Sequence, residues 1–187
     1  MNPFQIDNSD FQFLLDSIGE TVTIDNVEQK AIINNAKIGD YEDKYIYTLD
    51  SIQRGNLIVY NEKNYLIVSD VTEGKIYNKA LMRKCTHTIT IMIQEGSQVL
   101  VGVTPWGEEI WETVDPVYED FPCIVEQQKV VIDGGAIRTA DTEILITLQD
   151  NENTRKVKVN DVYNIAGYQY KVTHINYTKS GLLILKC

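Results

Sequence analysis

The sequence has few cysteines and histidines, and it has no long hydrophobic run. Its 187 residues include three cysteines and two histidines. Cys85, Cys123 and Cys187 form no CxxC pair and are odd in number, so we expect neither a disulfide framework nor a zinc site. Cys85 and Cys123 lie in apolar stretches, which predicts small buried side chains. No apolar run approaches the roughly 18 residues of a membrane helix, so we expect no membrane contact.

Recognisable catalytic motifs are also missing. Cys85 and His87 are two residues apart and would share one face of a strand, as a nucleophilic pair requires. A buried strand cysteine followed by an incidental histidine is the simpler interpretation. Neither Lys-Ser/Thr nor a helix pattern follows Gly134-Gly135, so a hairpin turn is expected there instead of a phosphate loop. We therefore predict no enzyme and no cofactor.

Positive charge is absent from one stretch of the chain. The net charge is −10, and residues 86–120 hold seven acids but no Lys or Arg. Tight binding to a nucleic-acid backbone needs clustered basic residues, so this balance argues against it. The acids could bind a divalent cation, but their spacing is not that of an EF-hand loop. A solvated acidic loop without metal is the prediction.

The N-terminal segment 1–19 has neither a basic start nor a long apolar core. It does not resemble a signal peptide, and synthesis in the cytoplasm is expected. Ser9 with Gln12 forms a capping-box pattern, and Gly19 is a helix stop. One helix is predicted between them, with an apolar face that covers the open end of a first barrel. That face consists of Phe11, Leu14, Leu15 and Ile18.

The chain does contain two similar regions, each made of three segments that align with those of the other. The aligned segments are Ala31–Leu49 with Val130–Leu148, Asn56–Ile67 with Asp161–Val172, and LMRKC at 81–85 with LILKC at 183–187. Tyr65 falls on Tyr170. Asn34-Asn35 and Asp133-Gly134 occupy one place and tolerate the positive φ of a hairpin turn. A tandem duplication is predicted; the alternative is that any two β-rich stretches share alternating apolar residues.

Each copy consists of short runs rich in Val, Ile, Leu and Tyr that polar or Gly breaks separate. The predicted fold is all-β, with two small β-barrel domains related by tandem duplication and one short N-terminal helix. Closure would remove exposed edges. Residues 1–103 form the helix and first barrel, with a hairpin extension over 89–103 that turns at 95–97. Residues 104–120 are an acidic aromatic linker, and 121–187 form the second barrel.

The linker offers the best candidate site. Trp106, Trp111 and Tyr118 are costly to expose, and Trp and Tyr are enriched at binding hot spots. One interpretation is a docking or lumen-facing surface, and the other is an internal plug of aromatic residues between the barrels. The candidate residues are Trp106, Glu108, Glu109, Trp111, Glu112, Tyr118, Glu119 and Asp120.

The order of these segments resembles a known family. PWGEEIWE runs into CIVEQQKVV, then EILITL, VNDVYNIAGYQYKVTHI and a closing LLILKC. This order is similar to the head-closure, or stopper, proteins of tailed bacteriophages, which form rings beneath the portal between capsid and tail. The first copy shares RGNLIVYNEKNYLIV. The resemblance covers 104–187 well and 20–85 more loosely, and it departs from the family in having two barrels instead of one.

The resemblance implies a structural protein of the virion neck that forms a ring of identical chains. Its partners would be portal or adaptor proteins and tail-completion proteins, with DNA passing nearby without specific binding. An acidic wall would repel DNA phosphates. Two barrels per chain would offer twice as many similar units as chains, which suits a junction between rings of different symmetry. The alternative is a twin-barrel binding module for a carbohydrate or protein, with Trp106 and Trp111 as contacts.

Overall fold

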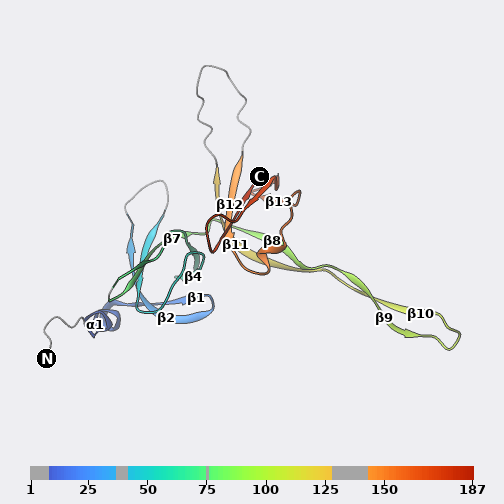
Figure 1. Cartoon of the computed structure of the whole chain (residues 1–187), viewed down its shortest axis with the longest axis horizontal. Coiled ribbons are helices and arrows are strands. Elements are labelled where there is room, and N and C mark those ends of the chain that lie inside the picture. Colours follow the sequence, from blue (N-terminus) through green and yellow to red (C-terminus); the bar gives the residue numbers. More distant parts are fainter. Residues whose placement is uncertain (1–8, 37–41, 75, 128–142) are drawn as a thin grey trace, which may run out of the picture.

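The structure is a computed structural model, and it describes residues 9–36, 42–74, 76–127 and 143–187. Over these ranges the chain is mostly β-strand, arranged as two units with a long ribbon extending from the second (Figure 1). The described residues contain one α-helix and a single turn of 3₁₀ helix. The all-β prediction with one short N-terminal helix is confirmed.

The first unit is a closed antiparallel barrel. Its elements are α1 (Ser9–Ile18), β1 (Glu20–Ile24), β2 (Val27–Asn35), β3 (Lys44–Thr48), β4 (Leu57–Tyr60), β5 (Lys63–Ile67), β6 (Thr72–Glu73) and β7 (Asn78–Lys84). The ring closes because β3 pairs with both β2 and β7, which continues through β5, β4 and β1. Closure removes the two free edges that these strands would have in an open sheet. Ile46, Ile58 and Met82 are fully buried inside it.

Residues with positive φ close the tight turns of this barrel. Asp25-Asn26 joins β1 to β2 with φ of 44° and 69°, and Asn61-Glu62 joins β4 to β5 with 48° and 60°. Such values match the hairpin turns that follow the twist of the strands. The turn predicted at Asn34-Asn35 is wrong, because both residues still pair with β3. Its counterpart at 133–134 lies outside the described residues.

Helix α1 begins and ends where the sequence predicts. Phe11 and Leu15 are buried, and the Phe11 ring stacks on Tyr77 with centroids 4.9 Å apart. Leu14 and Ile18 are exposed, so only half of the predicted apolar face is covered. No helix among the described residues has the length and apolarity needed to cross a membrane.

The second unit is an open sheet with an added hairpin. Its elements are β8 (His87–Gln94), β9 (Ser97–Val103), β10 (Glu109–Val114), β11 (Val117–Gln127), β12 (Ile144–Gln149), η1 (Thr154–Lys156), β13 (Val162–Ile165), β14 (Tyr168–Lys171), β15 (His174–Asn176) and β16 (Leu182–Lys186). The sheet order is β15-β16-β12-β11-β8, and β13 pairs with β14. Within the described residues no strand pairing closes this sheet, so it is not the closed ring of the first unit.

The strand order of the second unit nevertheless repeats that of the first. β8, β11, β12 and β16 take the places of β1, β2, β3 and β7, while β13 and β14 correspond to β4 and β5. Buried positions agree as well: Ala31 and Cys123 are fully buried, and Val22 and Ile89 nearly so. This agreement is what a tandem duplication predicts.

The predicted hairpin extension of the first barrel is wrong. β8 pairs with β11, for example at Ile89 and Phe121, whereas β9 pairs with β10. The two alternating apolar stretches, 89–93 and 99–103, therefore follow one another along a single ribbon, and Gly96 does not reverse the chain. The predicted linker 104–120 contains β10 and the start of β11.

The two units pack directly on each other. Leu66, Ile124 and Leu182 form a small buried cluster between them. Gly55 and Gly181 bring the two backbones into contact, since a Cβ atom on Gly55 would lie 1.9 Å from the carbonyl oxygen of Gly181. Only residues without a side chain allow so close an approach.

Polar contacts reinforce the same junction. Arg83 pairs with Asp43 of its own unit at 2.8 Å and also with Glu126 of the other unit. The Gln149 side chain donates to Asp25 Oδ1 at 2.8 Å. Half-buried charged groups of opposite sign that share a network fix orientation better than isolated surface pairs. The units are thereby held in one relative position.

Candidate functional site

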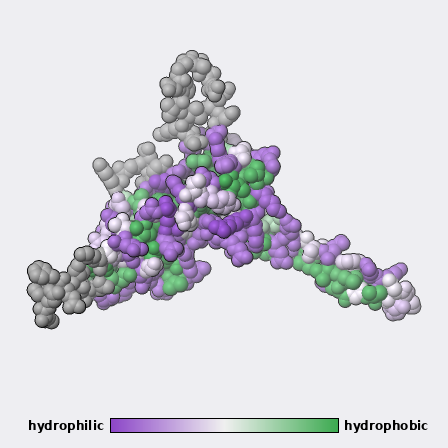
Figure 2. Space-filling view, viewed as in Figure 1, coloured by the Kyte–Doolittle hydropathy of each residue, from purple (hydrophilic) through white to green (hydrophobic). Residues whose placement is uncertain are grey.

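An extended apolar surface lies on the β9–β10 ribbon, called here the arm (Ser97–Val114). Figure 1 shows the arm running away from both units, and Figure 2 shows hydrophobic residues along it. Its exposed apolar side chains are Val99, Leu100, Val101, Val103, Trp106, Ile110, Trp111 and Val114. A two-stranded hairpin alone is marginally stable in water, and contiguous exposed apolar surface marks an interaction site.

The apolar side chains occupy both faces of the arm. Trp111 pairs with Leu100, and the next residue of β10, Glu112, pairs with Val99. Directly paired residues share a face, and successive residues point to opposite faces. Leu100 and Trp111 thus lie on one face and Val99 on the other. Covering this surface in full therefore takes contacts on both faces of the arm.

The predicted aromatic residues are exposed to solvent. The exposed fraction is 83% for Trp106, 52% for Trp111 and 58% for Tyr118. The internal-plug interpretation is therefore wrong, because none of the three side chains lies between the units. A docking or lumen-facing role for them stays a prediction.

The eight candidate residues do not form a single cluster. Five lie on the arm: Trp106, Glu108, Glu109, Trp111 and Glu112. The other three, Tyr118, Glu119 and Asp120, lie where β11 begins, at the root of the arm. Within the described residues, no group of three His, Cys, Asp or Glu side chains is placed to hold a metal ion.

Their carboxylates make local contacts. Glu109 accepts a hydrogen bond from Trp111 Nε1 at 3.2 Å. At the root, Asp120 accepts from Thr90 Oγ1 at 2.6 Å across the β8–β11 pair. The acids on the arm are thus left to face solvent, while those at the root brace the strands that carry it.

The 3₁₀ turn η1 also braces the arm root. Lys156 Nζ donates to the backbone oxygen of Ile93 at 2.6 Å. Lys158 Nζ pairs with Glu95 at 3.0 Å, and the hydrogen bond to this carboxylate raises the pKa of Lys158. These contacts connect residues far apart in the sequence, which is why sequence patterns did not reveal them.

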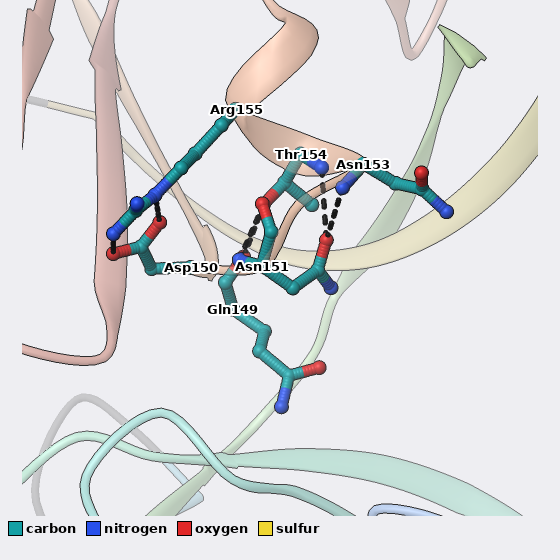
Figure 3. A network of polar contacts seen from close by, with 6 residues as sticks. All are labelled: Gln149, Asp150, Asn151, Asn153, Thr154 and Arg155. Atoms are coloured by element: carbon teal, nitrogen blue, oxygen red, sulfur yellow. Dashed lines mark hydrogen bonds and ion pairs between the residues drawn. The ribbon is translucent and has the colours of Figure 1, made fainter. Parts of the chain in front are cut away.

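A polar network holds η1 in place (Figure 3). Thr154 is fully buried, and its hydroxyl donates to the backbone oxygen of Gln149 at 2.7 Å. The Asn151 side-chain oxygen accepts from the backbone N–H groups of Asn153 and Thr154, at 3.0 and 2.9 Å. Asn, Ser and Thr side chains commonly fix turns in this way.

A groove of about 390 Å³ lies between η1, β13 and the arm root. Met92, Tyr118 and Val162 supply apolar lining, and Lys156 and Lys158 supply positive charge. Arg155 also lines it, and two bonds at 2.6 and 2.7 Å to Asp150 lower the pKa of that carboxyl. The sequence signal for this basic patch is the run RKVK at 155–158, which matches no motif of a binding site.

Cys85 and His87 do not share a strand face. Cys85 lies in the connection between β7 and β8, which begins at His87. Burial raises the pKa of the Cys85 thiol to about 12, and His87 Nδ1 lies 2.9 Å from Thr86 Oγ1. The Cys85 thiol is thus protonated at neutral pH, which makes it a poor nucleophile.

Comparison with known proteins places the two units in two described domains. Residues 2–84 match the YomX N-terminal domain, and residues 72–187 match the YomX C-terminal domain. The two matches overlap at residues 72–84, whereas the sequence predicts a first domain to residue 103, a linker over 104–120 and a second domain from 121.

One relative is a Bacillus subtilis (strain 168) protein named "SPbeta prophage-derived uncharacterized protein YomX". It is 29% identical over 174 residues, which cover 86% of this chain and 76% of the relative. No solved structure gives a significant match. Since the C-terminal domain alone covers more than half of the sequence, the chain belongs to the YomX family.

Proposed function

We propose that this chain is a non-enzymatic structural protein of a phage particle, in which copies assemble into a ring at the head–tail junction. The name of the Bacillus subtilis relative gives it a prophage origin. The all-β fold fits the resemblance to head-closure proteins, from which the chain departs in having two β units instead of one. Within this proposal the protein is made in the host cytoplasm and then built into the virion neck.

The arm is the observation that carries the proposal. Its strands bury no core of their own: every residue of β10 is exposed, as is every residue of β9 except Gly102. A stable ribbon with apolar residues on both faces is explained by a partner that covers it in an assembly. The rigid junction between the units would hold the arm at a fixed angle for this contact.

The charge distribution supports a place beside the genome. Residues 86–120 carry seven acids and no Lys or Arg, so this region repels DNA phosphates. A neck component of this kind lets DNA pass without binding it. Its neighbours would be portal or adaptor proteins on one side and tail-completion proteins on the other.

Two measurements test this function. Mass spectrometry of purified phage particles should detect the chain, and gold-labelled antibodies should mark the neck in electron micrographs. Analytical ultracentrifugation of the purified chain should show an oligomer of defined size. Absence of the chain from intact particles, or labelling only at the tail tip, would overturn the proposed position.

The exposure of Trp106 and Trp111 favours a second candidate, a binding module for a carbohydrate or protein on a cell surface. Replacing both residues with Ala separates the two functions. Loss of adsorption to cells with normal particle assembly supports the binding module. Particles that fail to join head to tail support the neck protein instead.

A further inference from the structure

The arm and the groove are complementary in charge and shape. At its tip the arm presents an indole ring and acids, because Trp106 and Glu108 lie between its two strands and Glu109 begins β10. The groove has apolar lining and the basic run 155–158. Glu95 and Asp161 also face the groove, and Glu95 already pairs with Lys158. Arg155 pairs with Asp150, whereas Lys156 Nζ donates to two neutral oxygens, of Ile93 at 2.6 Å and of Asn153 at 3.1 Å, so Lys156 is the described groove cation without a carboxylate partner.

The arm cannot reach the groove of its own chain. The groove contains Met92, Ile93 and Tyr118, which are root residues of the same ribbon. The arm extends straight outward from there (Figure 1), and from Glu95 to Trp106 it spans roughly 35 Å at the rise of a β-strand. Its tip therefore points away from the groove, so only the tip of another molecule can enter.

Two arms are also poor partners for each other. Their outer edges have unpaired backbone groups that could join edge to edge. However, the arm carries Glu108, Glu109 and Glu112 and no basic residue. Side-by-side pairing would bring like charges together, which is unfavourable. The acids thus direct the arm toward a basic surface.

We propose that the tip of the arm of one copy docks in the groove beside the arm root of a second copy. This contact rests on the proposed ring assembly and supplies its interface. It joins two different surfaces, so it is a head-to-tail interaction that closes into a ring when the rotation between copies allows it. The docked tip would also contact the residues that hold the neighbour's own arm in place. Binding of one copy therefore stabilises the arm that binds the next copy.

Charge reversal tests this contact. The arm variant is Glu108→Lys with Glu109→Lys, and the groove variant is Lys156→Glu with Lys158→Glu. Each variant alone should lose the oligomer seen for the unaltered chain in ultracentrifugation. Mixing the two should restore it, because each altered arm then meets a groove of opposite charge. Lys179→Glu, at an exposed site outside the groove, is the matched control and should assemble normally.

Each remaining outcome has a definite meaning. Normal assembly of either variant, or no recovery on mixing when circular dichroism shows both folded, overturns the arm–groove contact and leaves the ring in place. If the unaltered chain stays monomeric at its highest soluble concentration, the proposal that a second copy occupies the groove is rejected. If mixing restores the oligomer but the chain is absent from phage particles, the arm–groove contact is supported and the neck function is rejected.

Discussion

At the scale of single residues, Thr154 shows how a buried polar group can anchor the groove. Its hydroxyl donates to the Gln149 oxygen and accepts the Asn151 N–H at 2.9 Å. Thr154→Val keeps the shape of the side chain but leaves both backbone groups without this partner. We expect a loss of about 1–3 kcal/mol in the free energy of unfolding, measured with urea. Thr178→Val, at an exposed site, should change it by less than about 0.5 kcal/mol.

The thiols allow a second test at this scale. Burial raises the pKa of Cys85 and of Cys123 to about 12, so neither forms thiolate near pH 8. Because the thiolate is the reactive species, both should resist iodoacetamide in the folded chain and react once urea unfolds it. Cys187, like Cys85, is half-buried, whereas Cys123 is fully buried, so Cys123 should be the last thiol to react. Mass spectrometry of peptides gives the order, and prompt alkylation of Cys123 in the native chain would contradict the packing.

At the scale of elements, the repeat could be predicted more closely in one segment than in another. Tyr65 and Tyr170 do occupy equivalent places, and the matching bonds Ile67 N–H to Asn56 O and Val172 N–H to Asp161 O measure 3.1 and 2.8 Å. Gly and polar residues at the turns fixed the register there. This segment of the alignment was therefore correct residue by residue.

The alignment of β3 with β12 is wrong by one residue. It placed Ile46 on Leu145, but Ile46 pairs with Ala80 in the barrel, while Ile146 pairs with Leu185 in the corresponding position. A shift of one residue turns every side chain to the opposite face. Since Leu145 and Ile146 are both apolar, the hydrophobic pattern could not distinguish the two registers.

The arm escaped prediction for a related reason. In the first unit Asp25-Asn26 joins β1 to β2, and the whole arm stands at the same connection between β8 and β11. Alternating apolar residues normally indicate one buried face, so the sequence predicts that Val99, Val101 and Val103 belong to a hairpin that extends from the first barrel. An exposed strand whose apolar residues are covered by a partner molecule has the same alternating pattern in its sequence.

The contact between the units gives a prediction at the element scale. Gly55 has φ of +92°, and a Cβ atom there would meet the Gly181 oxygen at 1.9 Å. Gly55→Ala should therefore separate the units and cost more than the roughly 1–3 kcal/mol of backbone strain alone. Gly167→Ala is the matched control, because Gly167 has φ of +87° but no atom within 4 Å of the added group. Equal losses in thermal unfolding for the two variants would show that the close contact carries no extra energy.

At the scale of the whole molecule, the acids and aromatic residues of the candidate site were found from sequence, but their partner surface was not. The basic run 155–158 lies far along the chain from Glu95 and Ile93, which it contacts. Only the fold brings these segments together beside the arm root. The sequence therefore indicated what kind of chemistry the arm carries, while the place where it would dock depended on tertiary structure.

Removing the arm tests whether it serves assembly while contributing little to the stability of the two folded units. Gln94 and Val117 are paired neighbours, so Asn-Gly can replace residues 95–116 as a two-residue hairpin turn. Because the arm buries no core, the shortened chain should fold with a melting temperature within about 4 °C of the original, yet remain monomeric. Glu62→Gly, which makes the turn between β4 and β5 an Asn-Gly turn, is the control and should leave assembly intact. An armless chain that still forms the full oligomer would move the interface elsewhere, for example to the exposed side of α1 around Phe13.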